Sequence, residues 1–189
     1  DMNTKEEDFV TMSLTTSSHS DLLFFTDKGK AYQMKMYDLP EGKRATRGKS
    51  IMNFLQLVDG EKVTSILAMP KDVKAMAGIS LMMITKEGTV KKSSADSFKD
   101  VRRNGLIAIR LEEKDELLAA LFVSDEDNVM LTTQNGQSIR FNHTDVREMG
   151  RTAAGVIGMK LDKGDVIVAA DKVVTGVKGA ELLIMTANG

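Results

Sequence analysis

Four apolar runs in this sequence end in the same short pattern, Thr-x-x-Gly. The copies recur at intervals of roughly 50 residues, a period that is typical of propeller and solenoid repeats. They are Phe24–Gly29, Met83–Gly88, Leu131–Gly136 and Ile184–Gly189. A glycine just past a strand supplies the positive φ of a tight turn, and Asn-Gly at 135–136 and 188–189 is a strong hairpin signal. The pattern therefore predicts a series of β-hairpins in a repeat protein.

The apolar residues ahead of each turn are nearly continuous rather than alternating. They occupy positions 22–25, 81–84, 129–131 and 182–185. Continuous apolar strands are usually covered on both faces, and in a repeat protein the neighbouring repeats supply that cover. We therefore expect these strands to be buried between stacked repeats.

A second glycine follows each of the first three turns. It lies 19, 17 and 19 residues after the hairpin glycine, at Gly48, Gly105 and Gly155. Behind two of these glycines, residues 107–111 and 157–161 alternate apolar with small or basic positions, which predicts half-buried strands. A charged turn and a last apolar strand complete each repeat, at 65–69, 117–123 and 166–170.

These markers divide the chain into repeats of a single β domain. We place three full repeats at approximately 21–71, 78–126 and 127–175, with partial repeats at 1–20 and 179–189. The first partial repeat is expected to contain a strand over Phe9–Thr15. We expect the chain to be a piece of a longer array.

Composition narrows the class of protein. With 42% hydrophobic residues, 189 residues can bury a core, and two prolines with fifteen glycines favour an all-β chain. The absence of cysteine excludes disulfides and thiolate metal sites, and it suits a reducing cytoplasm. No apolar run approaches the roughly 18 residues of a membrane span, so we expect no membrane partner.

The net charge of −1 conceals a segregation of charge within the repeats. Residues 28–50 hold seven basic and two acidic residues, and residues 86–110 hold seven and three. Residues 134–160 hold four basic and two acidic residues, whereas residues 112–127 hold seven acids and one lysine. Each repeat thus has a basic half and an acidic half.

If the repeats stack radially, the basic halves fall on one rim and form a stripe. The candidate contacts are Arg44, Arg47, Lys49, Lys91, Lys92, Arg102, Arg103, Arg140, Arg147 and Arg151. Such a stripe suits a phosphate backbone, which is bound through counterion release with little sequence information. The alternative is that these are ordinary solvated loop charges.

The sequence gives little support for a catalytic site or a metal-binding site. His19 and His143 stand alone, and the pair Asp125 and Asp127 lacks the remaining spacing of a calcium loop. No serine occupies a nucleophile motif, and no glycine-rich phosphate loop opens a helix. We expect no catalytic residue, no metal and no cofactor in this chain.

Several segments resemble the C-terminal domain of the bacterial DNA gyrase A subunit, and the resemblance extends over essentially the whole chain. They are Phe25–Tyr32, Tyr37–Pro40, Arg47–Leu55, Arg103–Ala108 and Thr144–Val156. The last, with its Arg-Glu-Met-Gly-Arg run, is the most specific. The family's Gln-Arg-Arg-Gly-Gly-Lys-Gly box has no copy here.

The resemblance implies a β-pinwheel, a propeller-like disc of four-stranded blades that exchange strands, here about three blades with partial ends. It implies that double-stranded DNA wraps around a basic rim without regard to sequence. Supercoiling would be catalysed elsewhere, by the remainder of gyrase A with gyrase B, in the cytoplasm at the nucleoid. The rim corresponds loosely to the loops of Arg44, Arg47, Lys49, Arg102, Arg103, Arg147 and Arg151.

Three other interpretations stay open at this point. The chain could be the equivalent domain of topoisomerase IV, or a propeller-like protein-interaction module that uses its methionine-rich and acidic surfaces. A propeller-borne enzyme is disfavoured because no catalytic constellation is evident.

Overall fold

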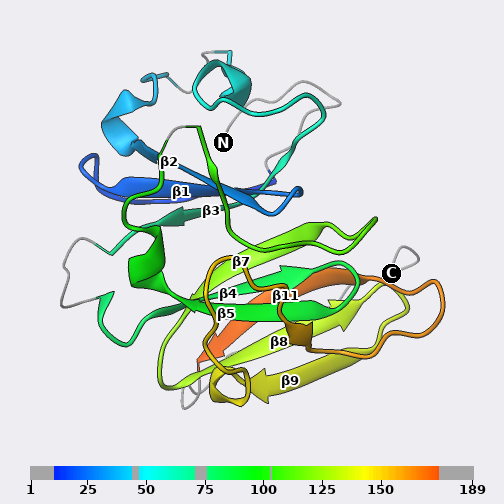
Figure 1. Cartoon of the computed structure of the whole chain (residues 1–189). Helices are drawn as coiled ribbons and strands as arrows, with labels where there is room; N and C mark the ends of the chain where they lie inside the picture. The colour runs from blue at the N-terminus through cyan, green and yellow to red at the C-terminus, as the bar shows by residue number, and fades with distance from the viewer. Residues whose placement is uncertain (1–10, 44–46, 71–75, 103, 175–189) are drawn as a thin grey trace.

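The computed structural model describes residues 11–43, 47–70, 76–102 and 104–174. Its strands are antiparallel and form three sheets (Figure 1). The first sheet has the order β3-β1-β2-β6, with strands Val63–Ala68, Asp21–Thr26, Lys30–Lys35 and Leu106–Ile107. The second has the order β10-β5-β4-β7, with strands Val156–Ile157, Thr89–Ser94, Ser80–Thr85 and Leu117–Val123.

The third sheet has the order β11-β8-β9, with strands Ile167–Val174, Asp127–Thr133 and Ser138–Asn142. Short 3-10 helices join the strands: η1 Met36–Asp38, η2 Ile51–Asn53, η3 Ala95–Phe98 and η4 His143–Asp145. The predicted all-β fold of stacked blades is confirmed. The fourth predicted hairpin, at 182–189, lies outside the described residues.

The Thr-x-x-Gly pattern closes the second and third hairpins by two local interactions. In the turn between β4 and β5, the Gly88 N–H donates to the Thr85 carbonyl at 3.2 Å, and the Thr89 N–H donates to Thr85 Oγ1 at 3.1 Å. Thr133 makes the same two bonds in the turn between β8 and β9. The glycine has a φ of +84° in both turns, where a side chain would be strained.

The second and third repeats each lend a short strand to the sheet before them. The strand β6 follows η3 in the chain but pairs with β2, and β10 pairs with β5. The chain then bends around the preceding hairpin, where the Gly29 carbonyl accepts the Ala108 N–H at 2.9 Å and the Ile109 N–H at 3.2 Å. The five-residue strands predicted at 107–111 and 157–161 were therefore too long, because this bend ends the ladder after two residues.

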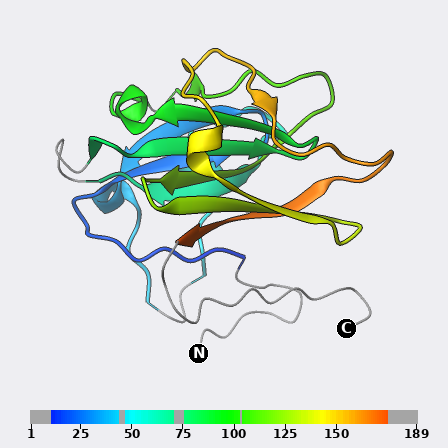
Figure 2. The ribbon, with the colours of Figure 1, turned by 90° about the horizontal axis from the view of Figure 1, so that it is seen from below.

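The sheets stack face to face, as Figure 2 shows from below. Leu23 and Phe25 of β1 pack with Leu81 and Met83 of β4, and the other face of β4 packs against β8. The strand β4 is buried at every position, as predicted. The prediction is wrong for β8, whose burial alternates, because the described residues provide a neighbouring sheet on one of its faces only.

The last strands of the three repeats lie closest together. β3 neighbours β7 and β7 neighbours β11, and the Ala120 N–H donates to Ser65 Oγ at 3.0 Å. Since β6 and β10 occupy the opposite edges of their sheets, they form the outer rim. Residues 11–15 of the predicted strand Phe9–Thr15 are not a strand, since no described residue pairs with their backbone; residues 9 and 10 lie outside the described part.

Candidate nucleic-acid interface

The loops that lead to the exchanged strands carry the exposed arginines of the rim. Arg102 precedes β6, and Arg147 and Arg151 lie in the segment between η4 and β10; all three are exposed. Arg47 and Lys49 are exposed in the corresponding connection of the first repeat, ahead of η2. Arg140 is exposed on β9. Arg44 and Arg103 lie outside the described residues.

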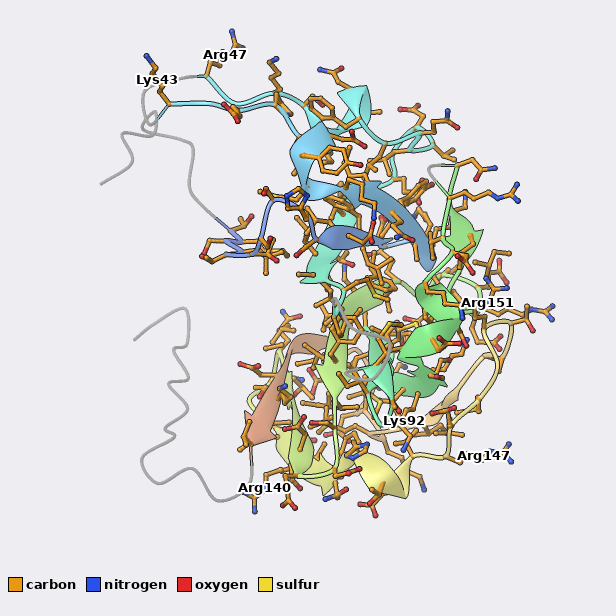
Figure 3. The ribbon with its side chains drawn as sticks, turned by 90° about the vertical axis from the view of Figure 1, so that its left-hand side faces the viewer. Lys43, Arg47, Lys92, Arg140, Arg147 and Arg151 are labelled. Carbon is orange, nitrogen blue, oxygen red and sulfur yellow. The ribbon has the colours of Figure 1, made fainter. Side chains whose placement is uncertain are left out.

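Figure 3 shows how these side chains are distributed. Arg147 and Arg151 project from the same edge of the molecule, at the right of the view. Arg47 lies with Lys43 at the upper left, and Arg140 lies at the bottom. The fold thus places Arg147 and Arg151 on the same edge, whereas one continuous stripe through all the candidates stays a prediction.

The arginines of the rim are free of ion pairs within the described part of the chain. The ion pairs found there join lysines to nearby acids, for example Lys86 to Glu116 at 2.5 Å and Lys35 to Asp21 at 2.7 Å. An unpaired guanidinium group presents its N–H donors in a fork that matches phosphate oxygens. These arginines are therefore available to an anionic partner.

Many of the acids of the charged turns face inward. Five are buried in the described residues: Asp27, Glu61, Asp115, Asp127 and Asp165. They accept backbone hydrogen bonds, such as that from the Glu116 N–H to Asp115 Oδ1 at 2.8 Å. For Asp165, burial raises the pKa, but a hydrogen bond with the Thr133 side chain and the bonds from backbone N–H groups outweigh it, so the pKa is lowered. The exposed surface is therefore less acidic than the composition indicates, which favours an anionic partner.

Lys91 and Lys92 are not exposed, and their assignment as phosphate contacts is corrected. The exposed fraction is 0% for Lys91 and 8% for Lys92. The Lys91 ammonium donates to the carbonyl oxygens of Ala108, at 2.7 Å, and Arg151, and that of Lys92 donates to the His143 carbonyl at 2.9 Å. Burial and the Arg151 charge lower the pKa of Lys91 to about 8.

The sequence interpretation missed two exposed basic residues on the rim. Arg110 and Lys160 each lie three residues beyond the exchanged strands β6 and β10. The sequence signal that identifies them is that they occupy equivalent positions in two repeats, five residues after Gly105 and Gly155. They extend the candidate interface along the outer edge.

No metal cluster is evident in the described part of the chain. Neither His143 nor Asp127 belongs to a group of three or more potential ligands among the described residues. His143 is buried, and Asp127 accepts the Ser124 N–H at 2.8 Å. No helix among the described residues is long and apolar enough to cross a membrane.

Comparison with known proteins identifies relatives along the whole chain. The chain is 39% identical over 188 residues to the DNA gyrase A protein of Staphylococcus epidermidis, an alignment that covers 100% of the chain and 21% of the relative. The chain therefore spans about a fifth of the length of such relatives.

Two solved structures share the fold. A DNA topoisomerase IV C-terminal domain superposes with a TM-score of 0.79 and 26% identity, covering 93% of this chain and 54% of that one. A DNA gyrase A C-terminal domain superposes with a TM-score of 0.67 and 28% identity, covering 84% of this chain and 49% of that one. A family model described as DNA gyrase C-terminal domain, beta-propeller, matches residues 20–68, 80–124 and 127–173. On this match, with the strand exchange and the exposed arginines, the chain belongs to the DNA gyrase C-terminal domain family.

Proposed function

We propose that this chain binds double-stranded DNA through the arginines of its rim and bends it, without regard to base sequence. The observation that carries the proposal is the pair Arg147 and Arg151, which are exposed, free of ion pairs with other described residues, and project from one edge. Membership of the DNA gyrase C-terminal domain family supports it.

In the whole protein, the bent DNA would support negative supercoiling by an ATP-dependent topoisomerase. The partners would be the remainder of gyrase A and gyrase B, and the location would be the bacterial cytoplasm at the nucleoid. The chain itself would be non-catalytic and would need no cofactor. The relatives that are DNA gyrase A proteins support this wider role.

The test is the binding of a labelled duplex of about 40 base pairs between 50 and 200 mM salt. A protein that makes 6 to 10 phosphate contacts loses about 10³- to 10⁵-fold in affinity over that range. A second duplex of unrelated sequence should bind equally well. An interface with an apolar core, as in a protein-interaction module, would show a much weaker salt dependence.

The arginines are tested by Arg151→Ala and by the double variant with Arg147→Ala. Removal of each phosphate contact should reduce the slope of log affinity against log salt by about 0.9. Lys62→Ala is the control of equal charge, because Lys62 is exposed, has no ion pair with a described residue and directly precedes β3, at the sheet edge opposite β6. The proposal fails if the control weakens binding as much as Arg151→Ala.

A further inference from the structure

The segment that carries Arg147 and Arg151 is fastened to a strand of the preceding repeat. We call residues 146–155 the arginine loop; it connects η4 to β10. Its backbone runs along the free edge of β5 beyond the short pairing with β10. The Met149 N–H donates to the Lys92 carbonyl at 2.8 Å, and a bridge joins Lys92 to Glu148.

Three consecutive side chains of β5 hold this segment by its carbonyl groups. Lys91 donates to the Arg151 carbonyl, and Ser93 Oγ donates to the Met149 carbonyl at 2.8 Å. Lys92 donates to the carbonyl of His143, just ahead of the loop, at 2.9 Å. Because successive side chains of a strand point to opposite faces, these hydrogen bonds hold the segment from both faces of β5.

The hold is strong because the groups that make it are buried. Lys91 and Ser93 are 0% exposed, so the carbonyl oxygens are the acceptors that replace water around them. Lys91 also donates to the Ala108 carbonyl, beside β6, which joins the loop to the exchanged strand of the preceding sheet. The Ser80 hydroxyl adds a bond of 3.2 Å to the Glu148 carboxylate.

This set of side chains occurs once among the three repeats. At the positions of Lys91, Lys92 and Ser93, the first repeat has Tyr32, Gln33 and Met34, and the third has Ile139, Arg140 and Phe141. The hold on the arginine loop is therefore not required by the fold itself, since the first sheet forms without it.

We infer that Lys91, Lys92 and Ser93 are positioning residues for DNA binding, which hold the arginine loop so that Arg147 and Arg151 project from the rim. The inference rests on the proposed function. A loop ordered in advance loses less conformational entropy when it binds than a loose one does. The buried lysines thus contribute to affinity without touching DNA.

The sharpest test is Ser93→Ala, which changes no charge and alters a residue that DNA cannot reach. In the DNA-free full chain, trypsin should cut faster after Arg147 and Arg151, while cleavage at other sites stays unchanged. Duplex affinity should fall about 3- to 10-fold, the value of one hydrogen bond. The matched control is Ser94→Ala on the same strand, whose side chain has no hydrogen bond to a described residue; both readouts should stay at the wild-type level.

Lys91→Met should produce a larger change in both readouts, since it removes two hydrogen bonds. In a protein that already carries Arg147→Ala and Arg151→Ala, Ser93→Ala should cause no further loss of affinity, because the groups that it positions are absent.

The possible outcomes separate the two proposals. Faster cleavage with unchanged affinity would overturn the positioning role, and so would weaker binding with unchanged cleavage at both arginines. A wild-type chain that does not bind DNA would overturn the proposed function and the positioning role with it. Cleavage would then still report whether β5 holds the loop.

Discussion

A Cβ atom on Gly88 would lie 2.5 Å from the carbonyl oxygen of Met159, a residue of the next repeat. The same turn offers its own carbonyl to that repeat, because the Gly88 oxygen accepts the Gly158 and Met159 N–H groups at 2.9 and 3.2 Å. The hairpin glycine therefore serves both the turn and the docking of the exchanged strand.

Because Gly88 has this double role, the same Gly→Ala substitution is predicted to lower the free energy of unfolding by different amounts at Gly88 and at Gly136. Gly88 and Gly136 share a φ of +84°, but a Cβ on Gly136 meets nothing within 4 Å. Gly136→Ala should lower the free energy of unfolding by about 1 to 2 kcal/mol, the cost of the left-handed backbone. Gly88→Ala should cost about 1 to 3 kcal/mol more, because a backbone atom must move. Urea denaturation measures both; equal midpoints would contradict the docking role.

Glu61 is predicted to be essential to the first hairpin. Its buried carboxylate accepts hydrogen bonds from Thr26 Oγ1 at 2.5 Å, from Tyr32 Oη at 2.9 Å and from the Val58 N–H at 2.9 Å. Glu61→Ala leaves these donors unpaired and should cost about 2 to 4 kcal/mol of stability by thermal or urea unfolding. Glu113→Ala, at an exposed position, should change stability by less than about 0.5 kcal/mol.

His143 should make stability depend on pH on the acid side of neutrality. Burial, and secondarily the Lys92 charge, lower its pKa below the usual 6.5, against the opposing effects of Asp127 and Asp125. Below pH 6.5 the unfolded chain binds a proton that the folded residue resists, so the free energy of unfolding falls as the pH falls.

His143→Met tests this prediction, since Met36 occupies the equivalent position of the first repeat. The variant removes two ring nitrogens that are buried without a hydrogen-bond partner among the described residues. It should gain about 1 kcal/mol at neutral pH, and its stability should fall less steeply than that of the wild type between pH 7 and 5. Parallel pH curves would show that His143 is not responsible.

Neutralising Arg102 and Arg103 should weaken binding to every duplex by about the same factor. Phosphate contacts position a protein on DNA and carry no base information, so the salt slope should also fall by about 0.9 for each arginine that touches a phosphate. Affinities of three unrelated duplexes, measured at two salt concentrations, provide the check. Unequal effects among the sequences would point to base contacts instead.

Local signals predicted much of the fold. The Thr-x-x-Gly turns predicted the hairpins at Gly29, Gly88 and Gly136 correctly, because turn chemistry resides in adjacent residues. The pairing of β6 with β2 joins residues far apart in the chain, and nothing in the alternation at 107–111 specified its short length. Contact with the preceding hairpin sets that length.

Charge was less informative than charge combined with burial. The basic halves of the repeats contain Arg47, Arg102, Arg147 and Arg151, which are exposed, but they also contain Lys91 and Lys92, which are buried. A lysine pair inside a predicted strand is compatible with a solvated face or with a buried bond to carbonyl groups, and sequence alone does not separate the two.

The sequence by itself determined the repeat, the hairpin turns and the presence of arginines in the connecting loops, because each depends on residues close together in the chain. The tertiary structure decided which charged side chains reach the surface and which are buried in hydrogen bonds inside the protein. Stacking and strand exchange place the carbonyl groups of one repeat against the side chains of another. Burial of a charged group depends on those distant partners, so only the folded chain separates Arg151 on the rim from Lys91 beneath it.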